Sequence, residues 1–248
     1  MASPPSARHP LPRVPAAVVF DFDGLLMDSE WVIYQSARSA FESHGHQLSV
    51  EAWATVVGIN DDHHGTWWDD LCAAAGVTGF TRAEFDALHE EGAGREALRA
   101  AMLDLPLLPR AAVLVDGLAA AGVPLAVASS SSTGWLERNL ERLGVRHRFG
   151  PLVGSDQVGG VGKPAPDVYL RACADLGADP ARSVAIEDSA HGVTAAKAAG
   201  MAAVAVPSRI TRFNDFAHAD LVVGSLEHLT PTGLAALVEH PPPRPIAR

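Results

Sequence analysis

The chain has little of several residue types and patterns, and each scarcity excludes a class of protein. Of 248 residues only two are lysine and two are cysteine, against 17 arginines. Cys72 and Cys173 stand far apart in alanine-rich segments, which predicts free thiols rather than a disulfide or a cysteine metal site. No apolar run approaches membrane-spanning length, and residues 1–13 lack the apolar segment of a signal peptide. We therefore expect a cytoplasmic protein.

Charge and composition narrow the possible partners. A net charge of −10 argues against nucleic acid or an anionic membrane surface as a partner. With 48% hydrophobic and 19% charged residues, the chain is typical of a folded protein with a large core. The proline-rich ends, residues 1–13 and 241–245, are expected to be disordered. We expect a small-molecule ligand and a monomer or weak homodimer.

The order of apolar runs predicts an α/β fold with an insertion. Short strand-like runs alternate with helical runs at Ala16–Phe20, Pro124–Ala128, Gly150–Gly154, Ser183–Ile186, Ala202–Val206 and Asp220–Val223. That alternation is typical of a parallel sheet covered by helices on both faces, a three-layer, Rossmann-like core over residues 14–30 and 104–232. Residues 31–103 contain no convincing strand and are predicted to form a helical subdomain, and residues 233–248 a helix remnant and a tail.

Two carboxylates follow the first predicted strand, and their position is unusual. Asp21 and Asp23 are two residues apart, a spacing that places both side chains on one face of a strand. Gly24 then lets the backbone turn away from the strand direction. Because neighbouring carboxylates at a buried strand end repel each other, a divalent cation such as Mg²⁺ is the simplest compensation. One aspartate could then act as a nucleophile and the other could transfer protons, although this motif alone also fits an ordinary turn or a calcium site.

Three later strand ends carry further polar groups. The second run ends in Ser129-Ser130-Ser131-Ser132-Thr133, whose hydroxyls could bind an anion or cap the next helix. Lys163 lies in a glycine- and proline-framed loop, where its compact charge suits a phosphate or a carboxylate. Another strand-like run ends in Glu187-Asp188, a second acidic pair that could equally serve the following helix terminus. Because ligands bind at the carboxyl ends of parallel strands, all four segments are predicted to form one site.

Together these four segments resemble the haloacid dehalogenase superfamily, in its branch of phosphatases and phosphohexomutases with a helical cap. The resemblance covers roughly residues 14–230. It implies a Mg²⁺-dependent hydrolysis of a small phosphomonoester through an aspartyl phosphate, with residues 31–103 as the cap. It assigns the nucleophile to Asp21, proton transfer to Asp23 and charge neutralisation to Lys163. The phosphate-binding residues that it implies are Ser129, Ser130, Ser131, Lys163 and Gly24, and the metal ligands are Asp21, Asp23 through its main-chain carbonyl, Glu187 and Asp188.

Alternative activities within the superfamily are less well matched. Haloacid dehalogenases generally lack the second aspartate, which is present here as Asp23. Phosphonate-cleaving relatives need a cap lysine, and residues 31–103 contain none. A β-phosphoglucomutase-like phosphohexomutase is the main alternative. Ile33 replaces the histidine that such enzymes carry, and Asn60-Asp61-Asp62 stands where a cap arginine is expected, whereas the hydroxyls of Ser131-Ser132-Thr133 match a second phosphate site.

Two non-enzymatic functions are also disfavoured. A receiver-like signalling module has its acidic pair and its acceptor aspartate on different strands, and it has no helical insertion of this size. A catalytically inactive phosphate-binding module should have lost Asp21, Asp23 or Lys163, and all three are present.

Overall fold

The computed structural model of the protein describes residues 14–58, 66–89 and 92–239. Its centre is a parallel sheet of order β3-β2-β1-β4-β5-β6. The strands are β1 Val18–Phe20, β2 Leu125–Ala128, β3 Leu152–Val153, β4 Val184–Glu187, β5 Ala202–Ala205 and β6 Leu221–Val222. Each lies within or within one residue of a run predicted from the sequence, and the predicted α/β fold class is confirmed.

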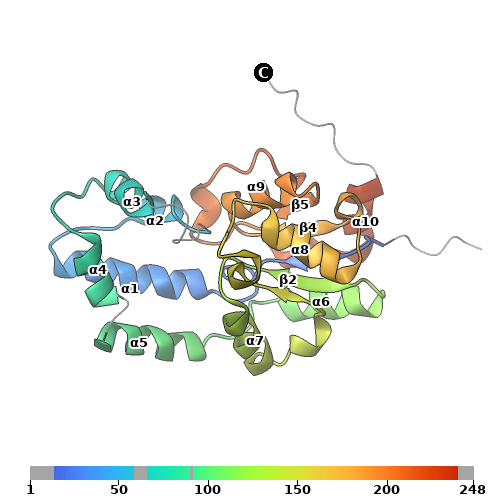
Figure 1. Ribbon diagram of the computed structural model, residues 1–248, viewed down its shortest axis with the longest axis horizontal. Helices are drawn as coiled ribbons and strands as arrows, with labels where there is room; N and C mark the ends of the chain where they lie inside the picture. Colours follow the sequence, from blue (N-terminus) through green and yellow to red (C-terminus); the bar gives the residue numbers. More distant parts are fainter. Residues whose placement is uncertain (1–13, 59–65, 90–91, 240–248) are drawn as a thin grey trace, which may run out of the picture.

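Helices cover both faces of this sheet (Figure 1). After the first strand the chain forms α1 Ser29–Ser43, α2 Val50–Ala54, α3 Trp67–Ala75, α4 Arg82–His89 and α5 Gly92–Leu103. The helices that accompany the later strands are α6 Ala111–Ala120, α7 Thr133–Arg142, α8 Asp167–Leu176, α9 Ala190–Ala198 and α10 Pro231–Glu239. Short 3₁₀ turns lie at η1 Arg146–Arg148, η2 Ser155–Val158, η3 Pro180–Arg182, η4 Thr211–Phe213 and η5 Leu226–His228.

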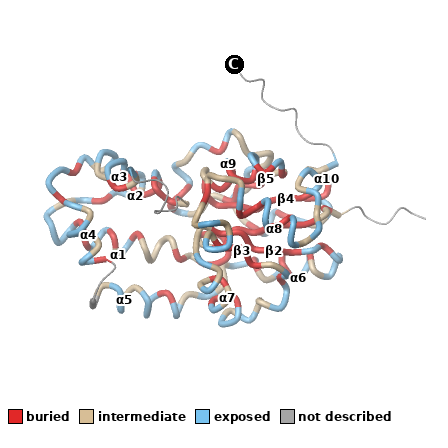
Figure 2. The backbone as a smooth tube through the Cα atoms, in the orientation of Figure 1, coloured by how far each residue is buried: buried red, intermediate tan, exposed pale blue. Residues whose placement is uncertain are grey.

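The two faces of the sheet are packed differently. One face presents large side chains such as Phe20, Val127 and Ile186 to α6, α7 and α10. The opposite face is rich in alanine, including Ala126 and Ala185, and α8 and α9 pack against it. Figure 2 shows the strands as the buried centre of the molecule. Because strand side chains alternate between faces, the apolar runs dictate this three-layer arrangement.

Helices α1 to α5 form a separate lobe with a core of its own (Figure 1). Phe41, Trp68 and Phe85 pack together there, with ring centroids 5.0 to 6.0 Å apart. Ile210, from the loop after β5, is fully buried in the same cluster. The sheet domain therefore holds the helical lobe through an apolar anchor as well as through the two connecting segments.

Some sequence-based expectations fall outside the described residues. These are the disorder of residues 1–13 and 241–245, and the role of Asn60-Asp61-Asp62. Cys72 and Cys173 are free thiols, as predicted. In the described part of the chain, no helix is both long and apolar enough to cross a membrane.

Candidate active site

A cluster of buried charges lies where β1 and β4 end. Asp21, Glu187 and Asp188 each offer a carboxylate oxygen within 4.8 Å of the others. Asp21 follows β1 directly, and Glu187 is the last residue of the neighbouring strand β4. Adjacent parallel strands therefore bring together two acidic segments that are more than 160 residues apart in sequence.

Lys163 is the buried cation of this cluster. Its ammonium Nζ donates to Asp21 Oδ1 and to Glu187 Oε1, both at 2.5 Å, and the side chain is 2% exposed. Burial alone would lower the pKa of Lys163, but the two carboxylates outweigh burial and raise that pKa above its usual value. Tyr169 on α8 also donates to Glu187 Oε1, at 2.5 Å. Glu187 therefore positions the lysine as well as contributing charge.

Several carboxyl groups are crowded around this single lysine. Burial raises the pKa of Asp21 to about 8, although Lys163 lowers it. Burial also raises the pKa of Asp188 well above its usual range, with a further contribution from Asp21. Glu30, at the start of α1, has its pKa raised to about 8 by burial and by Asp23 and Asp21. These raised pKa values mean that ionisation of the crowded carboxyl groups is unfavourable beside a single ammonium, so their ionised forms need a further positive charge.

The unpaired oxygen of Asp188 shows where a cation fits. Asp188 Oδ2 is buried and has no hydrogen-bond partner among the residues that the structure describes. A buried carboxylate oxygen without a partner is costly, and hard divalent cations take such oxygens as ligands. Gly24, at φ +84°, lies so close that an added Cβ would stand 2.3 Å from this oxygen. The backbone at Gly24, in the loop after β1, therefore lies directly against Asp188 Oδ2. The carboxylates of Asp21, Glu187 and Asp188 are oxygen donors of the kind that fits Mg²⁺.

Asp23 is held apart from this cluster by four donors. Its Oδ1 accepts from Ser29 Oγ at 2.6 Å and from the indole Nε1 of Trp135 at 3.1 Å. Its Oδ2 accepts from Ser131 Oγ at 2.7 Å and, more weakly, from Ser129 Oγ at 3.5 Å. The carboxylate thus has a defined position beside the serine loop and is not among the three carboxylates of the acidic cluster.

The other serine-loop hydroxyls also have partners within the protein. Ser130 Oγ accepts from the Lys163 backbone N–H at 3.2 Å and donates to the Gly58 carbonyl of the helical lobe at 3.3 Å. Ser132 caps α7 by accepting from the Trp135 N–H. Thr133 Oγ1 donates to Asp156 at 2.9 Å. The capping role that the sequence left open therefore applies to Ser132, while Ser130 joins the two lobes.

The structure brings the residues singled out in the sequence to one end of the sheet. These residues are Asp21, Asp23, Gly24, Ser129, Ser130, Ser131, Lys163, Glu187 and Asp188. Four neighbours have no role predicted from the sequence: Ser29, Glu30, Trp135 and Tyr169. Ser29 and Glu30 directly continue the first motif, so their proximity was a usable signal. Trp135 and Tyr169 lie on helices, where no local pattern indicates which residue faces the site.

Comparisons with known proteins agree with this geometry. A family model for haloacid dehalogenase-like hydrolases matches residues 15–200. YhcW of Bacillus subtilis, which is named as a phosphatase, is 33% identical to this chain over 233 residues. The match covers 90% of this chain and 96% of YhcW. Hexitol phosphatase B of Escherichia coli strain K12 is 32% identical over 226 residues, covering 88% of this chain and 96% of the relative. A solved HAD family hydrolase from Deinococcus radiodurans R1, with bound phosphate and sodium, is 30% identical with a TM-score of 0.64 and covers 93% of this chain and 97% of that one.

A parallel-sheet enzyme with its acidic site at the strand ends is therefore the class that the fold defines. The chain belongs to the haloacid dehalogenase-like hydrolase family. The resemblance stated from the four sequence segments is confirmed.

Proposed function

We propose that this protein is a Mg²⁺-dependent phosphatase that hydrolyses a small phosphomonoester through an aspartyl-phosphate intermediate. The observation that carries the proposal is the buried contact between Asp21 and Lys163 beside the unpaired oxygen of Asp188. The Asp21 carboxylate and a phosphomonoester are both anions and repel each other. The Lys163 ammonium and a cation bound at Asp188 would reduce this repulsion, so the arrangement suits attack of Asp21 on phosphorus. The phosphatase names of the relatives support the same reaction class.

The proposed chemistry has two steps. The Asp21 carboxylate attacks phosphorus, the bond from phosphorus to the ester oxygen breaks, and Asp23 gives its proton to that oxygen. Asp23 then takes a proton from water as the water oxygen attacks phosphorus, which releases phosphate and regenerates the Asp21 carboxylate. Lys163 offsets the charge on Asp21 and on the phosphoryl oxygens throughout. Ser129, with the backbone N–H groups that follow it, orients the phosphoryl group.

The proposed metal ligands are Asp21, Asp188 and the main-chain carbonyl of Asp23. Bound Mg²⁺ supplies positive charge that offsets the charge on the transferring phosphoryl oxygens. Glu187 is placed by its bonds to Lys163 and Tyr169, so we assign it to the site as a charge that orients the lysine or contacts the cation through water.

We further propose that the helical lobe, residues 31–103, acts as a cap over this site. The hydrogen bond from Ser130 to the Gly58 carbonyl joins the serine loop to the lobe. Gly58, at φ +83°, also lies close to Ser189, since an added Cβ would stand 2.8 Å from Ser189 Oγ. A lobe that contacts both the serine loop and Ser189, which follows the Glu187-Asp188 pair, can exclude bulk water from the reacting groups.

A phosphohexomutase remains the alternative, and the hydroxyls that favoured it have other uses. Such an enzyme needs groups that hold a second phosphate. Ser131, Ser132 and Thr133 instead bond to Asp23, to the helix terminus and to Asp156. Incubation with β-glucose 1-phosphate and catalytic glucose 1,6-bisphosphate separates the two activities. Glucose 6-phosphate forming faster than free phosphate would favour the mutase.

The central experiment is phosphate release from p-nitrophenyl phosphate by chelator-treated protein, with and without added Mg²⁺. We expect no turnover until Mg²⁺ is added, and none at all for Asp21→Asn, whose amide is nearly isosteric but a poor nucleophile. Lys163→Ala should also abolish turnover. Lys197→Ala is the matched control, because Lys197 pairs with Asp220 at the surface. Full activity without a divalent ion, or equal effects of the two lysine variants, would contradict the proposal.

A further inference from the structure

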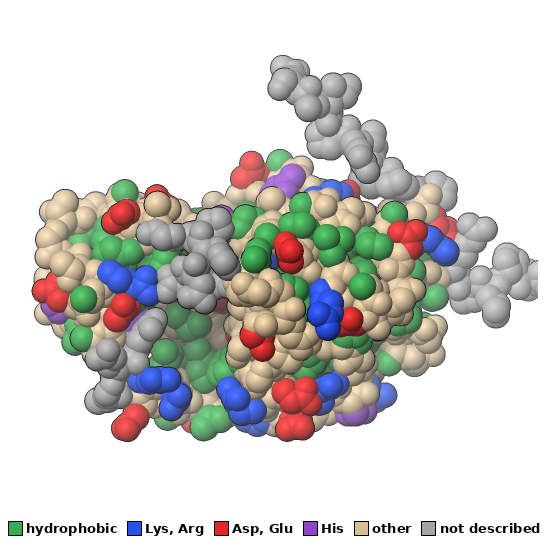
Figure 3. Space-filling model, in the orientation of Figure 1, with side chains coloured by type: hydrophobic (Ala, Val, Ile, Leu, Met, Phe, Trp, Pro, Cys, Tyr) green, Lys and Arg blue, Asp and Glu red, His purple; other side chains and the backbone are tan. Residues whose placement is uncertain are grey.

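A cavity of about 580 Å³ lies between the helical lobe and the sheet domain, and Asp23 is among the residues that line it. Its walls come from α1 and α5 on one side and from α7 on the other. Figure 3 shows a hollow between the two lobes, with hydrophobic side chains inside it and Lys or Arg side chains along its lower edge. The volume is in the range of small-molecule sites. Since Asp23 is the group proposed to protonate the leaving oxygen, the substrate's leaving group belongs in this cavity.

The wall of the cavity is mainly apolar. Ile33, Leu98, Met102, Leu103 and Trp135 line it. Two of its polar side chains are already used, because Asn139 donates to the Trp135 carbonyl and Arg142 donates to the Leu105 carbonyl. A hydroxyl placed against such a wall loses its water without gaining a partner, whereas a hydrocarbon surface gains from burial. The wall therefore favours an apolar leaving group over a polyhydroxylated one.

Two arginines line the cavity from opposite lobes. Arg99 on α5 and Arg138 on α7 are both exposed, and neither makes a hydrogen bond or ion pair with any residue that the structure describes. They approach from opposite lobes, so an anion held between them would bridge the helical lobe and the sheet domain. A guanidinium suits a planar carboxylate, because it donates two parallel hydrogen bonds to it, as it also does to a phosphate.

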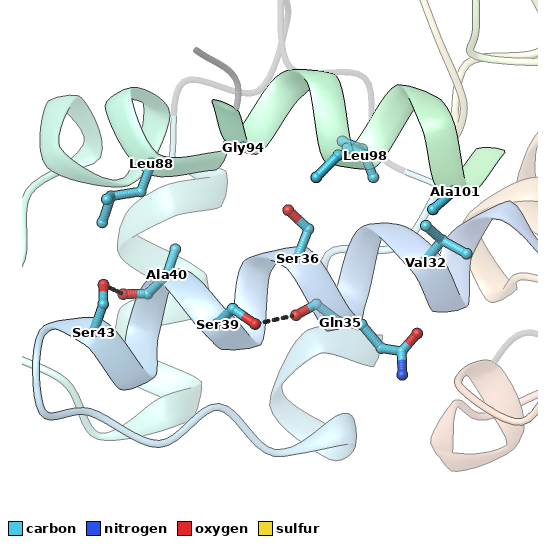
Figure 4. A pocket seen from close by; sticks show the side chains of 11 residues that line it. Val32, Gln35, Ser36, Ser39, Ala40, Ser43, Leu88, Gly94, Leu98 and Ala101 are labelled. Atoms are coloured by element: carbon cyan, nitrogen blue, oxygen red, sulfur yellow. Dashed lines mark hydrogen bonds between the residues drawn. The ribbon is translucent and has the colours of Figure 1, made fainter. Parts of the chain in front are cut away.

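A second cavity, of about 430 Å³, lies between α1 and α5 and shares Leu98 with the first (Figure 4). It is lined by small residues, and its hydroxyls bond within the protein, as Ser39 does to the Gln35 carbonyl and Ser43 to the Ala40 carbonyl. None of the proposed catalytic residues lines it. The leaving group is therefore assigned to the first cavity alone.

We propose that the substrate is a phosphomonoester whose leaving group is largely apolar and carries a distal carboxylate, which Arg99 and Arg138 bind from opposite sides. The inference deepens the proposed phosphatase function and rests on it. Arg99 and Arg138 are then specificity-determining residues, and they act on substrate binding more than on the chemical step.

The test compares three primary-alcohol phosphates, so that the leaving oxygens have similar acidity. They are 4-carboxybenzyl phosphate, its neutral amide 4-carbamoylbenzyl phosphate, and sorbitol 6-phosphate. The wild-type protein should favour the carboxylate over the amide in kcat/KM by about 10- to 100-fold, as expected for a charge-assisted hydrogen bond. Sorbitol 6-phosphate should be the poorest of the three.

Arginine variants make the test specific. Arg99→Gln and Arg138→Gln should each lower kcat/KM for the carboxylate substrate about tenfold more than for the amide substrate, mainly through KM. Arg182→Gln is the matched control. Arg182 is an exposed arginine in η3, directly before β4, and therefore lies near the amino-terminal ends of the strands, away from the site at their carboxyl ends. Equal rates for carboxylate and amide, a preference unaffected by both variants, or faster turnover of sorbitol 6-phosphate would overturn the inference. Absence of phosphate release from these compounds and from p-nitrophenyl phosphate alike would instead overturn the proposed phosphatase function.

Discussion

Replacement of Gly192 by alanine tests how tightly Glu187 is held in the site. Gly192 lies in the first turn of α9, and a Cβ built there would stand 2.0 Å from the carboxylate carbon of Glu187 and 2.0 to 2.1 Å from both of its oxygens. Real Cβ contacts under 3.0 Å essentially do not occur, so Glu187 or α9 must move by about 1 Å. Lys163 and Tyr169 already stand 2.5 Å from Glu187 Oε1, which leaves no room for the carboxylate to retreat toward them.

The expected cost follows from these contacts. Breaking a buried ion pair destabilises a protein by about 3 to 5 kcal/mol. Alanine gains at most about 1 kcal/mol over glycine in a helix, so Gly192→Ala should lose about 2 to 4 kcal/mol in free energy of unfolding. Turnover should fall about 100-fold, because Lys163 loses the partner that fixes its position.

Gly117→Ala is the matched control. Gly117 also lies within a helix, α6, and an added Cβ there meets nothing within 4 Å. This variant should gain up to about 1 kcal/mol and keep wild-type turnover. Urea unfolding followed by tryptophan fluorescence, together with phosphate release, measures both quantities. If Gly192→Ala were as stable and as active as Gly117→Ala, the tight packing of Glu187 would be refuted.

Three further predictions concern other parts of the molecule. Burial lowers the pKa of His89 from 6.5 to about 4, so the unfolded chain binds a proton first, and stability is lost as pH falls from about 6.5 toward 4. Linkage gives a loss of about 2 kcal/mol at about pH 5, which urea unfolding should show for the wild type but not for His89→Gln. Gly24 and Gly200 both have a φ of +84°, so Gly24→Ala and Gly200→Ala should each lose about 1 to 2 kcal/mol in free energy of unfolding. Only Gly24→Ala crowds Asp188, so only this variant should lose the thermal stabilisation that Mg²⁺ gives. Trp135→Phe keeps an aromatic ring and removes one hydrogen bond to Asp23, the proposed acid–base group, so kcat should fall about tenfold with KM little changed. A wild-type kcat in this variant would show that the indole N–H contributes nothing.

Much of the fold and the position of the site could be predicted from the sequence. Short apolar runs followed by polar groups are local patterns, and β1 and β4 lie where those runs predicted strands. Because parallel strands end at one edge of a sheet, the order of the runs was enough to predict that Asp21, Lys163 and Asp188 share one site. Helices α1 to α5 lie where the lack of strand-like runs in residues 31–103 predicted helices.

The sequence could not indicate which distant side chains contact these groups. The indole of Trp135 bonds to Asp23 across 112 positions, and Tyr169 bonds to Glu187 across 18. Such contacts depend on how each helix is rotated about its axis against the sheet. That rotation is fixed only when the helix packs against one of the two sheet faces, the face with large side chains or the alanine-rich face. Arg99 and Arg138 lie on different lobes, so their shared cavity exists only once the helical lobe is anchored on the sheet domain. The sequence by itself therefore determined the proposed reacting groups, through local patterns at the strand ends, whereas tertiary packing alone decided which side chains surround the proposed leaving group.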